Sequence, residues 1–242
     1  MPFNSRQTGM VRQALWFFVL AFTALLAGAA AAQSSDQDWP RCIDDAATDN
    51  VMIEACTAVI RSGHETDANL SIAFKNLCLA HNDKGDHDRA IQDCDQAIRL
   101  HPGYVMAYLY RGHAYFNKAD YDRAIQDYDQ AIAFGSNDAT TFVERGAAYH
   151  RKGDEVRAIT DLNQAITLDS DDAIAFYVRG AAYQAVNHND QAILDYSYAI
   201  KLAPRFAVSF YRRGVLKIKM GDIKGGEADI AQARTIDPHL GK

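Results

Sequence analysis

Apolar and polar positions follow the period of an amphipathic helix along most of the chain, and the pattern itself recurs every 34 residues. Segment 86–98 reads DHDRAIQDCDQAI, and segment 120–132 reads DYDRAIQDYDQAI. In both, apolar residues recur at spacings of three and four, which places them on one helical face. A second stretch with helical spacing, such as Tyr108, Gly112 and Tyr115, precedes the later segment. The pattern therefore predicts a series of helical hairpins.

The 34-residue period keeps aromatic, small and acidic residues in register almost to the C-terminus. Small side chains at matching positions allow two antiparallel helices to approach closely. An aspartate after each break stands where a helix N-cap is favoured. The aligned positions are Phe74, Tyr108, Phe142, Phe176 and Phe210 (aromatic), Cys78, Gly112, Gly146, Gly180 and Gly214 (small), and Asp86, Asp120, Asp154 and Asp222 (expected N-caps).

A 34-residue helix–turn–helix unit with these residues resembles the tetratricopeptide repeat (TPR). The Arg-Gly pair in the first helix and the D-Y-D-Q-A-I run in the second resemble exported bacterial members of that family. The resemblance implies an all-α, right-handed α-solenoid that binds partner proteins. The repeats are expected at 71–104, 105–138, 139–172, 173–206 and 207–240, after an extra N-terminal helical hairpin at 33–70.

The first 32 residues have the pattern of an export signal. Arg6 and Arg12 precede an apolar run, 14–28, which is short for a membrane span, and Ala30 to Ala32 fit a cleavage site before Gln33. We expect a signal peptide at 1–32 and an exported protein, periplasmic or secreted. The alternative is an uncleaved anchor, because the alanines can extend the run. Cleavage would change the formal net charge from −6 to −8, since the only charged residues removed are the two arginines.

Four cysteines follow the expected cleavage site. In the TPR alignment, Cys78 takes the small position of a first helix and Cys94 takes the aromatic position that faces it. Cys42 and Cys56 have nearly the same separation, 14 against 16 residues. We therefore expect disulfides Cys42–Cys56 and Cys78–Cys94, each joining two antiparallel helices. Buried free thiols are the alternative, and a metal site made by Cys78, His81 and Cys94 is a less favoured one.

An arginine precedes each glycine of units two to five, and an aspartate lies late in every second helix. We predict that each aspartate pairs with the arginine of the following unit and so fixes the angle between repeats; pairing within one unit is the alternative. The predicted pairs are Asp93–Arg111, Asp127–Arg145, Asp161–Arg179 and Asp195–Arg213.

In TPR proteins the first helices line a concave groove, so the resemblance implies a ligand groove on this face. The Lys and Asn pattern of TPR proteins that grip chaperone C-termini is matched only at Lys75, which argues against that clamp. Asn76 and Asn82 also map to this face. The groove positions expected to contact a ligand are Lys75, Leu79, Tyr110, His113, Phe116, Asn117, Glu144, Ala147, His150, Arg151, Tyr177, Ala181, Tyr211 and Arg212.

Composition and motifs narrow the function further. The net charge of −6 and the lack of a basic run argue against a nucleic-acid surface. No nucleophile elbow, zinc-protease motif, P-loop or dinucleotide fingerprint is present. We expect no enzyme activity and no cofactor. The leading hypothesis is a protein-binding adaptor of the cell envelope. The alternatives are a receptor for glycan or peptidoglycan, and self-association through the convex face or the ends of the array.

Overall fold

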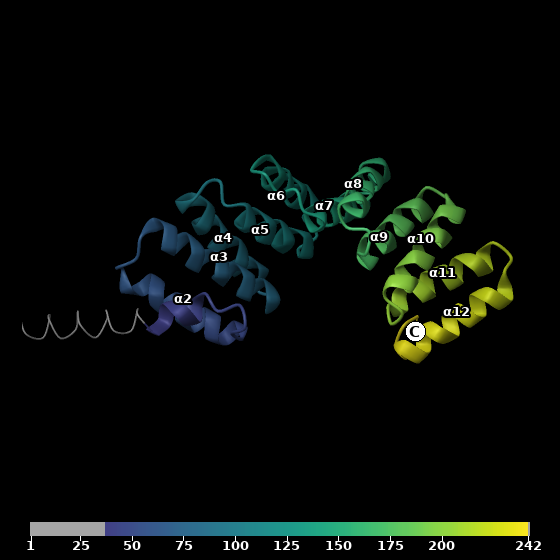
Figure 1. Cartoon of the computed structure of the whole chain (residues 1–242), viewed down its shortest axis with the longest axis horizontal. Coiled ribbons are helices and arrows are strands. Elements are labelled where there is room, and N and C mark those ends of the chain that lie inside the picture. The colour runs from purple at the N-terminus through teal and green to yellow at the C-terminus, as the bar shows by residue number, and fades with distance from the viewer. Residues whose placement is uncertain (1–36, 242) are drawn as a thin grey trace, which may run out of the picture. The chain divides into compact units, whose positions relative to one another are not determined.

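A computed structural model describes residues 37–241 of the chain. The expected signal peptide, 1–32, lies outside the described residues. Within 37–241 the chain is all-helical (Figure 1). It divides into two compact units after Pro102. No helix in this part of the chain is both long and apolar enough to cross a membrane. The all-helical structure, with helices packed in consecutive pairs, agrees with the all-α solenoid expected from the repeat pattern.

The first unit contains a helical stretch at 37–42 followed by three longer helices. These are α2 (Asp49–Ser62), α3 (Asp67–Asp83) and α4 (His87–Leu100). Its core is made of Cys42, Met52, Ala55, Cys56, Val59, Ala73, Leu77 and Ala80, all buried. The Asn76 side chain donates a 2.8 Å hydrogen bond to the Cys42 carbonyl, which ties the N-terminal stretch to α3.

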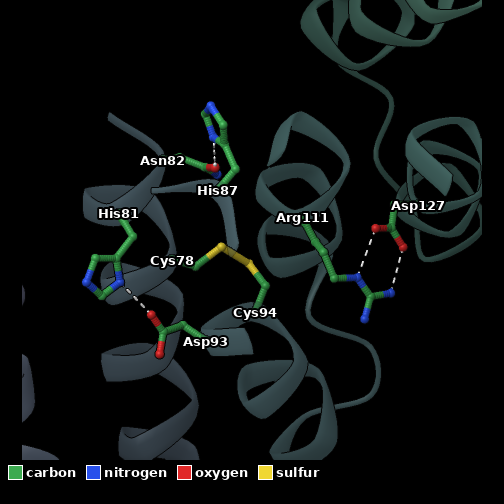
Figure 2. The surroundings of a disulfide bond; sticks show 8 residues. All are labelled: Cys78, His81, Asn82, His87, Asp93, Cys94, Arg111 and Asp127. Carbon is green, nitrogen blue, oxygen red and sulfur yellow. Dashed lines mark hydrogen bonds and ion pairs between the residues drawn. A yellow bond between two sulfur atoms is a disulfide. The ribbon is translucent and has the colours of Figure 1, made fainter. Parts of the chain in front are cut away.

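Both expected disulfides are present in the first unit. Cys42 is bonded to Cys56 and Cys78 to Cys94, and all four residues are fully buried. Figure 2 shows the Cys78–Cys94 bond between α3 and α4, with the His81 and Asp93 side chains meeting beside it. Because each bond joins two helical segments, it restricts the unfolded chain of this unit and so favours the folded hairpins.

The second unit consists of four helical hairpins. Its helices are α5 (Val105–Asn117), α6 (Tyr121–Ala133), α7 (Ala139–Lys152), α8 (Glu155–Leu168), α9 (Ala173–Ala185), α10 (Asn189–Leu202), α11 (Ala207–Lys219) and α12 (Ile223–Ile236). Consecutive helices pack as pairs, and each pair also packs on the next. The last helix exposes Glu227 and Arg234, where the preceding repeats carry isoleucines, so the end of the array is polar.

The expected N-caps are confirmed. Asp86, Asp120, Asp154 and Asp222 each accept a hydrogen bond from the backbone N–H three residues later, at 3.0–3.3 Å. In the fourth repeat His188 takes this position and forms no side-chain cap. The caps fix the start of the second helix in the repeats that have one.

Small residues hold the two helices of a repeat close together. A Cβ atom on Gly112 would lie 2.8 Å from the Tyr128 ring. In the last repeat Gly214 and Gly226 face each other, and a Cβ on Gly214 would lie 2.7 Å from the Gly226 carbonyl oxygen. Backbone cannot yield as a side chain can, so this crossing admits only glycine on both helices.

The predicted Asp–Arg pairing is wrong in its register. Each arginine instead forms a two-pronged ion pair with the aspartate 16 residues later, in the second helix of its own repeat. The observed pairs are Arg111–Asp127, Arg145–Asp161, Arg179–Asp195 and Arg213–Asp229, at 2.6–2.9 Å. The remaining aspartate of the predicted set, Asp93, pairs with His81 at 2.7 Å.

The close helix crossing explains the observed register. Each arginine directly precedes the small residue at which the two helices of a repeat meet. A Cβ on Gly180, for example, would lie 3.2 Å from the Asp195 Cβ. The guanidinium of Arg179 is therefore already beside Asp195, whose side chain is 3% exposed. Burial of that carboxylate requires a charged partner at this level.

The link between repeats exists, but it uses other residues. In the last three repeats, the remaining guanidinium nitrogen of the arginine reaches the second helix of the preceding repeat, 16 residues earlier. Arg145 donates to Asp129 at 2.6 Å, Arg179 to Asn163 at 2.7 Å, and Arg213 to Ser197 at 3.0 Å. Each of these arginines therefore links its own helix to two others. One is the second helix of its own repeat, and the other belongs to the preceding hairpin.

Candidate functional site

Two adjoining pockets lie along the first helices of the second unit. The larger, 450 Å³, is named the basic pocket and is lined by Phe116, Ala147, His150, Arg151, Tyr177, Val178, Ala181, Gln184, Ala185 and Arg212. The smaller, 320 Å³, is named the acidic pocket and is lined by His113, Phe116, Tyr128, Thr140, Val143, Glu144, Ala147, Asp172, Ile174 and Val178. Phe116, Ala147 and Val178 line both, so the pockets form one continuous groove.

Helix geometry explains why these side chains converge. Positions 143, 144, 147, 150 and 151 recur at helical spacing on α7, so they form one face of that helix. The facing positions on α5, α9 and α11 are one repeat apart. The space results from small residues, since Ala147 and Ala181 occupy positions where a larger side chain would fill the groove.

The acidic pocket is lined by the hydrogen-bonded side chains of Tyr128 and Glu144. The Tyr128 side chain, from α6, is 1% exposed and its hydroxyl donates a hydrogen bond to the Glu144 carboxylate. Burial raises the pKa of Glu144 to about 7. The hydrogen bond from Tyr128 opposes this rise, and the negative charge of nearby Asp138 adds to it. Burial and the Glu144 charge together raise the pKa of Tyr128, so its proton stays in place. Glu144 therefore changes charge near neutral pH.

Asp172 completes the acidic pocket at the start of α9. Its side chain caps that helix, accepting from the N–H groups of Ile174 at 2.7 Å and Ala175 at 3.3 Å. The capping bonds use one carboxylate oxygen, Oδ1. The other oxygen, Oδ2, accepts no hydrogen bond from the residues in 37–241 and can accept one from a ligand.

The basic pocket carries two exposed guanidinium groups, from Arg151 on α7 and Arg212 on α11. His150 lies beside them, and its Nδ1 is 2.8 Å from Glu155. Tyr177 forms part of the wall and packs against Phe206, with ring centroids 5.2 Å apart. This pocket can therefore offer an aromatic face and two charged hydrogen-bond donors to a ligand.

Most of the groove residues expected from the sequence line these pockets. They are His113, Phe116, Glu144, Ala147, His150, Arg151, Tyr177, Ala181 and Arg212. Tyr110, Asn117 and Tyr211 lie on α5 and α11 but outside both pockets. Lys75 and Leu79 are half-buried on α3 in the first unit. Burial lowers the pKa of Lys75, while Asp45 acts in the opposite direction.

Two expectations about the face in the first unit are wrong. Asn76 and Asn82 are buried rather than exposed to a ligand. Asn76 bonds the Cys42 carbonyl, and the Asn82 side chain meets the His87 ring at 3.3 Å. The extra N-terminal helical stretch covers the position that is open in an internal repeat, and this is why Asn76 turns inward.

Sequence reasoning missed Tyr128, Asp172 and Ala185 as pocket residues. Tyr128 belongs to a second helix, whereas the resemblance places the groove on the first helices alone. Asp172 stands in a break between repeats, outside the helical face that was mapped. The aspartate before the first helix of a repeat is the signal that could have found it, since an N-cap carboxylate keeps an oxygen free.

The described residues show no metal centre. Within 37–241 no group of three or more histidine, cysteine, aspartate or glutamate side chains is placed to hold a metal ion. Cys78 and Cys94, two members of the metal site considered from the sequence, are bonded to each other.

Comparisons with known proteins agree with this architecture. Family models described as tetratricopeptide repeat match residues 71–104, 94–126 and 139–172, and a model described as TPR repeat matches 113–153. These matches place tetratricopeptide repeats across residues 71–172 and, with the all-helical fold, support a tetratricopeptide repeat protein. No curated protein matches it in sequence. Repeats of this family are typically non-catalytic scaffolds, and the fold supports a protein–protein interaction module.

Solved structures with the same fold are distant in sequence. A TPR protein from Parabacteroides merdae is 18% identical, with a TM-score of 0.71, over 84% of this chain and 80% of that one. MamA from Desulfovibrio magneticus is 18% identical, TM-score 0.64, over 74% and 99%. YrrB, described as a TPR protein with an unusual peptide-binding site, is 22% identical, TM-score 0.60, over 78% and 95%. At these identities the likeness concerns the fold.

Proposed function

We propose that this protein is a non-enzymatic adaptor of the bacterial cell envelope that binds a peptide segment of a partner protein in the groove of the second unit. The observation that carries the proposal is the continuity of the two pockets through Phe116, Ala147 and Val178. An extended peptide presents side chains in succession, and a groove with adjoining hollows can accept them. YrrB, a TPR protein with an unusual peptide-binding site, gives a precedent on the same fold.

The disulfides support the proposed location. Two fully buried bonds are typical of proteins from an oxidising compartment. Together with the N-terminal apolar run, they favour export to the periplasm or the medium. Fractionation of cells, followed by alkylation of free thiols and mass measurement, tests this directly. Recovery of the chain in the cytoplasm with four free thiols would contradict the proposed location.

The groove is tested by filling it. Ala147 lines both pockets, so Ala147→Phe should block both without exposing a new charge. The matched control is Ala133→Phe, at an exposed position near the end of α6 and outside both pockets. Tagged full-length protein and both variants would be used to capture partners from envelope extract. A partner that the parent and Ala133→Phe retain and Ala147→Phe loses supports the proposal; a partner retained by all three places binding elsewhere.

A receptor for envelope glycan is the second candidate. Phe116 and Tyr177 both line the basic pocket, and aromatic faces can stack on sugar rings. Soluble peptidoglycan fragments would then raise the melting temperature of the protein, and Tyr177→Ala would remove the shift. Peptides alone producing the shift would exclude this candidate.

A further inference from the structure

The two pockets of the groove carry opposite charge. The acidic pocket contains the carboxylates of Glu144 and Asp172, and among its lining residues within 37–241 there is no lysine or arginine. The basic pocket contains Arg151 and Arg212, and in the described chain no carboxylate lines it. The separation is complete, although the apolar residues Phe116, Ala147 and Val178 are shared.

None of these charges is neutralised by an ion pair within the described residues, although Asp172 caps α9 and Glu144 accepts a hydrogen bond from Tyr128. In the part of the chain that the structure describes, no ion pair involves Glu144, Asp172, Arg151 or Arg212. The arginines of the Arg–Asp pairs within each repeat, named here the ladder, differ in this respect, since Arg145 and Arg179 each bond an aspartate at 2.8 Å. Groove charges without a partner of opposite charge, beside structural charges that are ion-paired, are the pattern of a surface that recognises a charged ligand.

The chemistry of each pocket defines what it accepts. A guanidinium presents a planar set of N–H donors that matches a carboxylate, and two of them can hold one between them. Glu144, half-buried above Tyr128, presents an acceptor in partly desolvated surroundings, where a lysine or arginine side chain is the matching group. Between them, Phe116 and Val178 offer an apolar contact.

We propose that the groove selects an extended peptide of dipolar charge, with a lysine or arginine side chain in the acidic pocket, an apolar residue over Phe116 and Val178, and a carboxylate in the basic pocket. This rests on the proposed function, and adds the chemistry that the ligand must have. The carboxylate belongs either to an aspartate or glutamate side chain or to the C-terminus of the partner.

The test uses labelled peptides and fluorescence anisotropy with the purified full chain. Each peptide carries a lysine and a glutamate separated by a leucine spacer; spacers of increasing length and both orders of the charges are included. Matching peptides carry glutamine in place of either charge. Amidated and free C-termini separate the two sources of the carboxylate. We expect one dipolar peptide to bind best, and loss of either charge to weaken binding about tenfold or more.

Variants assign each charge to its pocket. Arg212→Gln should weaken the dipolar peptide about tenfold, yet leave the peptide without the glutamate unchanged. Glu144→Gln should likewise weaken binding of the dipolar peptide about tenfold and leave binding of the peptide without the lysine unchanged. Arg212→Glu should favour a peptide in which the glutamate is replaced by a second lysine. Arg205→Gln and Glu227→Gln, both exposed and outside the pockets, are the matched controls and should change nothing.

The outcomes separate this proposal from the proposed function. Peptides that bind equally well with and without their charges, and that Ala147→Phe excludes, overturn the dipolar selection and leave the peptide groove standing. No binding by any member of the panel overturns the dipolar selection. In that case a partner captured by the parent and lost in Ala147→Phe would still uphold the proposed function, and capture unaffected by that change would remove both.

Discussion

The two units of the chain hold equivalent helix pairs together by different means. In the first unit Cys78 and Cys94 form a covalent bond at the level where the helices of the repeat meet. In the second unit the same two positions are Gly112 and Tyr128, which are in close van der Waals contact. A disulfide therefore replaces a glycine–aromatic contact without a change in the hairpin.

The buried aspartate of this level also differs between the units. Asp93 in the first unit is paired with a histidine, His81, whereas Asp127, Asp161, Asp195 and Asp229 are each held by an arginine. The arginines of the later repeats reach the preceding hairpin as well. The first repeat thus combines a covalent bond with a His81–Asp93 hydrogen bond, whereas the later repeats rely on the ladder of Arg–Asp pairs.

Breaking the ladder should have the largest effect. Arg179→Met leaves Asp195, 2% exposed, without a charged partner. We expect a loss of about 3–5 kcal/mol in the free energy of unfolding of the second unit, because an unpaired buried charge is costly. Urea denaturation followed by circular dichroism measures it. Arg205→Met, at an exposed site outside the ladder, is the control and should change little.

A double-mutant cycle checks the register of the ladder. Arg145 should couple strongly to Asp161, in its own repeat, and only weakly to Asp127, in the preceding one. Coupling to Asp127 that exceeds coupling to Asp161 would contradict the observed arrangement and restore the one expected from the sequence.

Replacing the disulfide of the first unit with the glycine–tyrosine contact of the second unit tests whether the two are equivalent. Cys78→Ser with Cys94→Ser removes a bond that closes a 16-residue separation, and should cost roughly 3 kcal/mol. Cys78→Gly with Cys94→Tyr installs the contact of the second unit and should restore part of that loss. Cys94→Tyr with Cys78→Ser should be worst, since a Cβ at the equivalent Gly112 would lie 2.8 Å from the tyrosine ring. Equal denaturation midpoints for all three would refute this equivalence.

The two kinds of aspartate should respond to pH in opposite directions. Burial raises the pKa of Asp93, and the His81 contact only partly offsets it. For Asp229 burial also acts upward, but hydrogen bonds from Arg213 and Lys217 outweigh it and the pKa is lowered. A carboxyl group whose pKa is raised in the folded state favours folding below the unfolded pKa of about 3.9, and this contribution is lost as pH rises. A carboxyl group whose pKa is lowered in the folded state favours folding above that value, and this contribution is lost on acidification.

Asparagine variants measure this difference. Asp229→Asn should cost about 1.5–3 kcal/mol at neutral pH, and progressively less as pH falls below about 4. Asp93→Asn should show the reverse trend, costing least at neutral pH. Unfolding free energies measured from strongly acidic to neutral pH give both slopes. Parallel slopes for the two variants would show that histidine and arginine hold this carboxylate equally.

The sequence predicted which residues occupy equivalent positions in each repeat, but it did not predict which of these residues pair with one another. The reason is physical. The 34-residue period places Arg145 and the aspartates in fixed register, but Asp127 and Asp161 then stand at equivalent positions, and periodicity cannot distinguish them. Only the helix crossing beside Gly146 does so. The groove face followed from helical spacing, whereas Asp172 did not, because it lies in a break between helices. Asn76 turned inward under a segment that has no counterpart in the other repeats.

The smallest expected effect concerns the one second helix of a repeat that, within 37–241, begins without a side-chain cap. Asp86 caps α4 in the first unit, while His188 precedes α10 in the second and accepts nothing. His188→Asp should add a capping hydrogen bond and favourable charge at the helix N-terminus, and so stabilise the second unit by about 1 kcal/mol. Asp154→His, the converse change, should destabilise it by a similar amount. Melting temperatures that move together for the two variants would show that the cap contributes nothing and that packing alone sets where these helices begin.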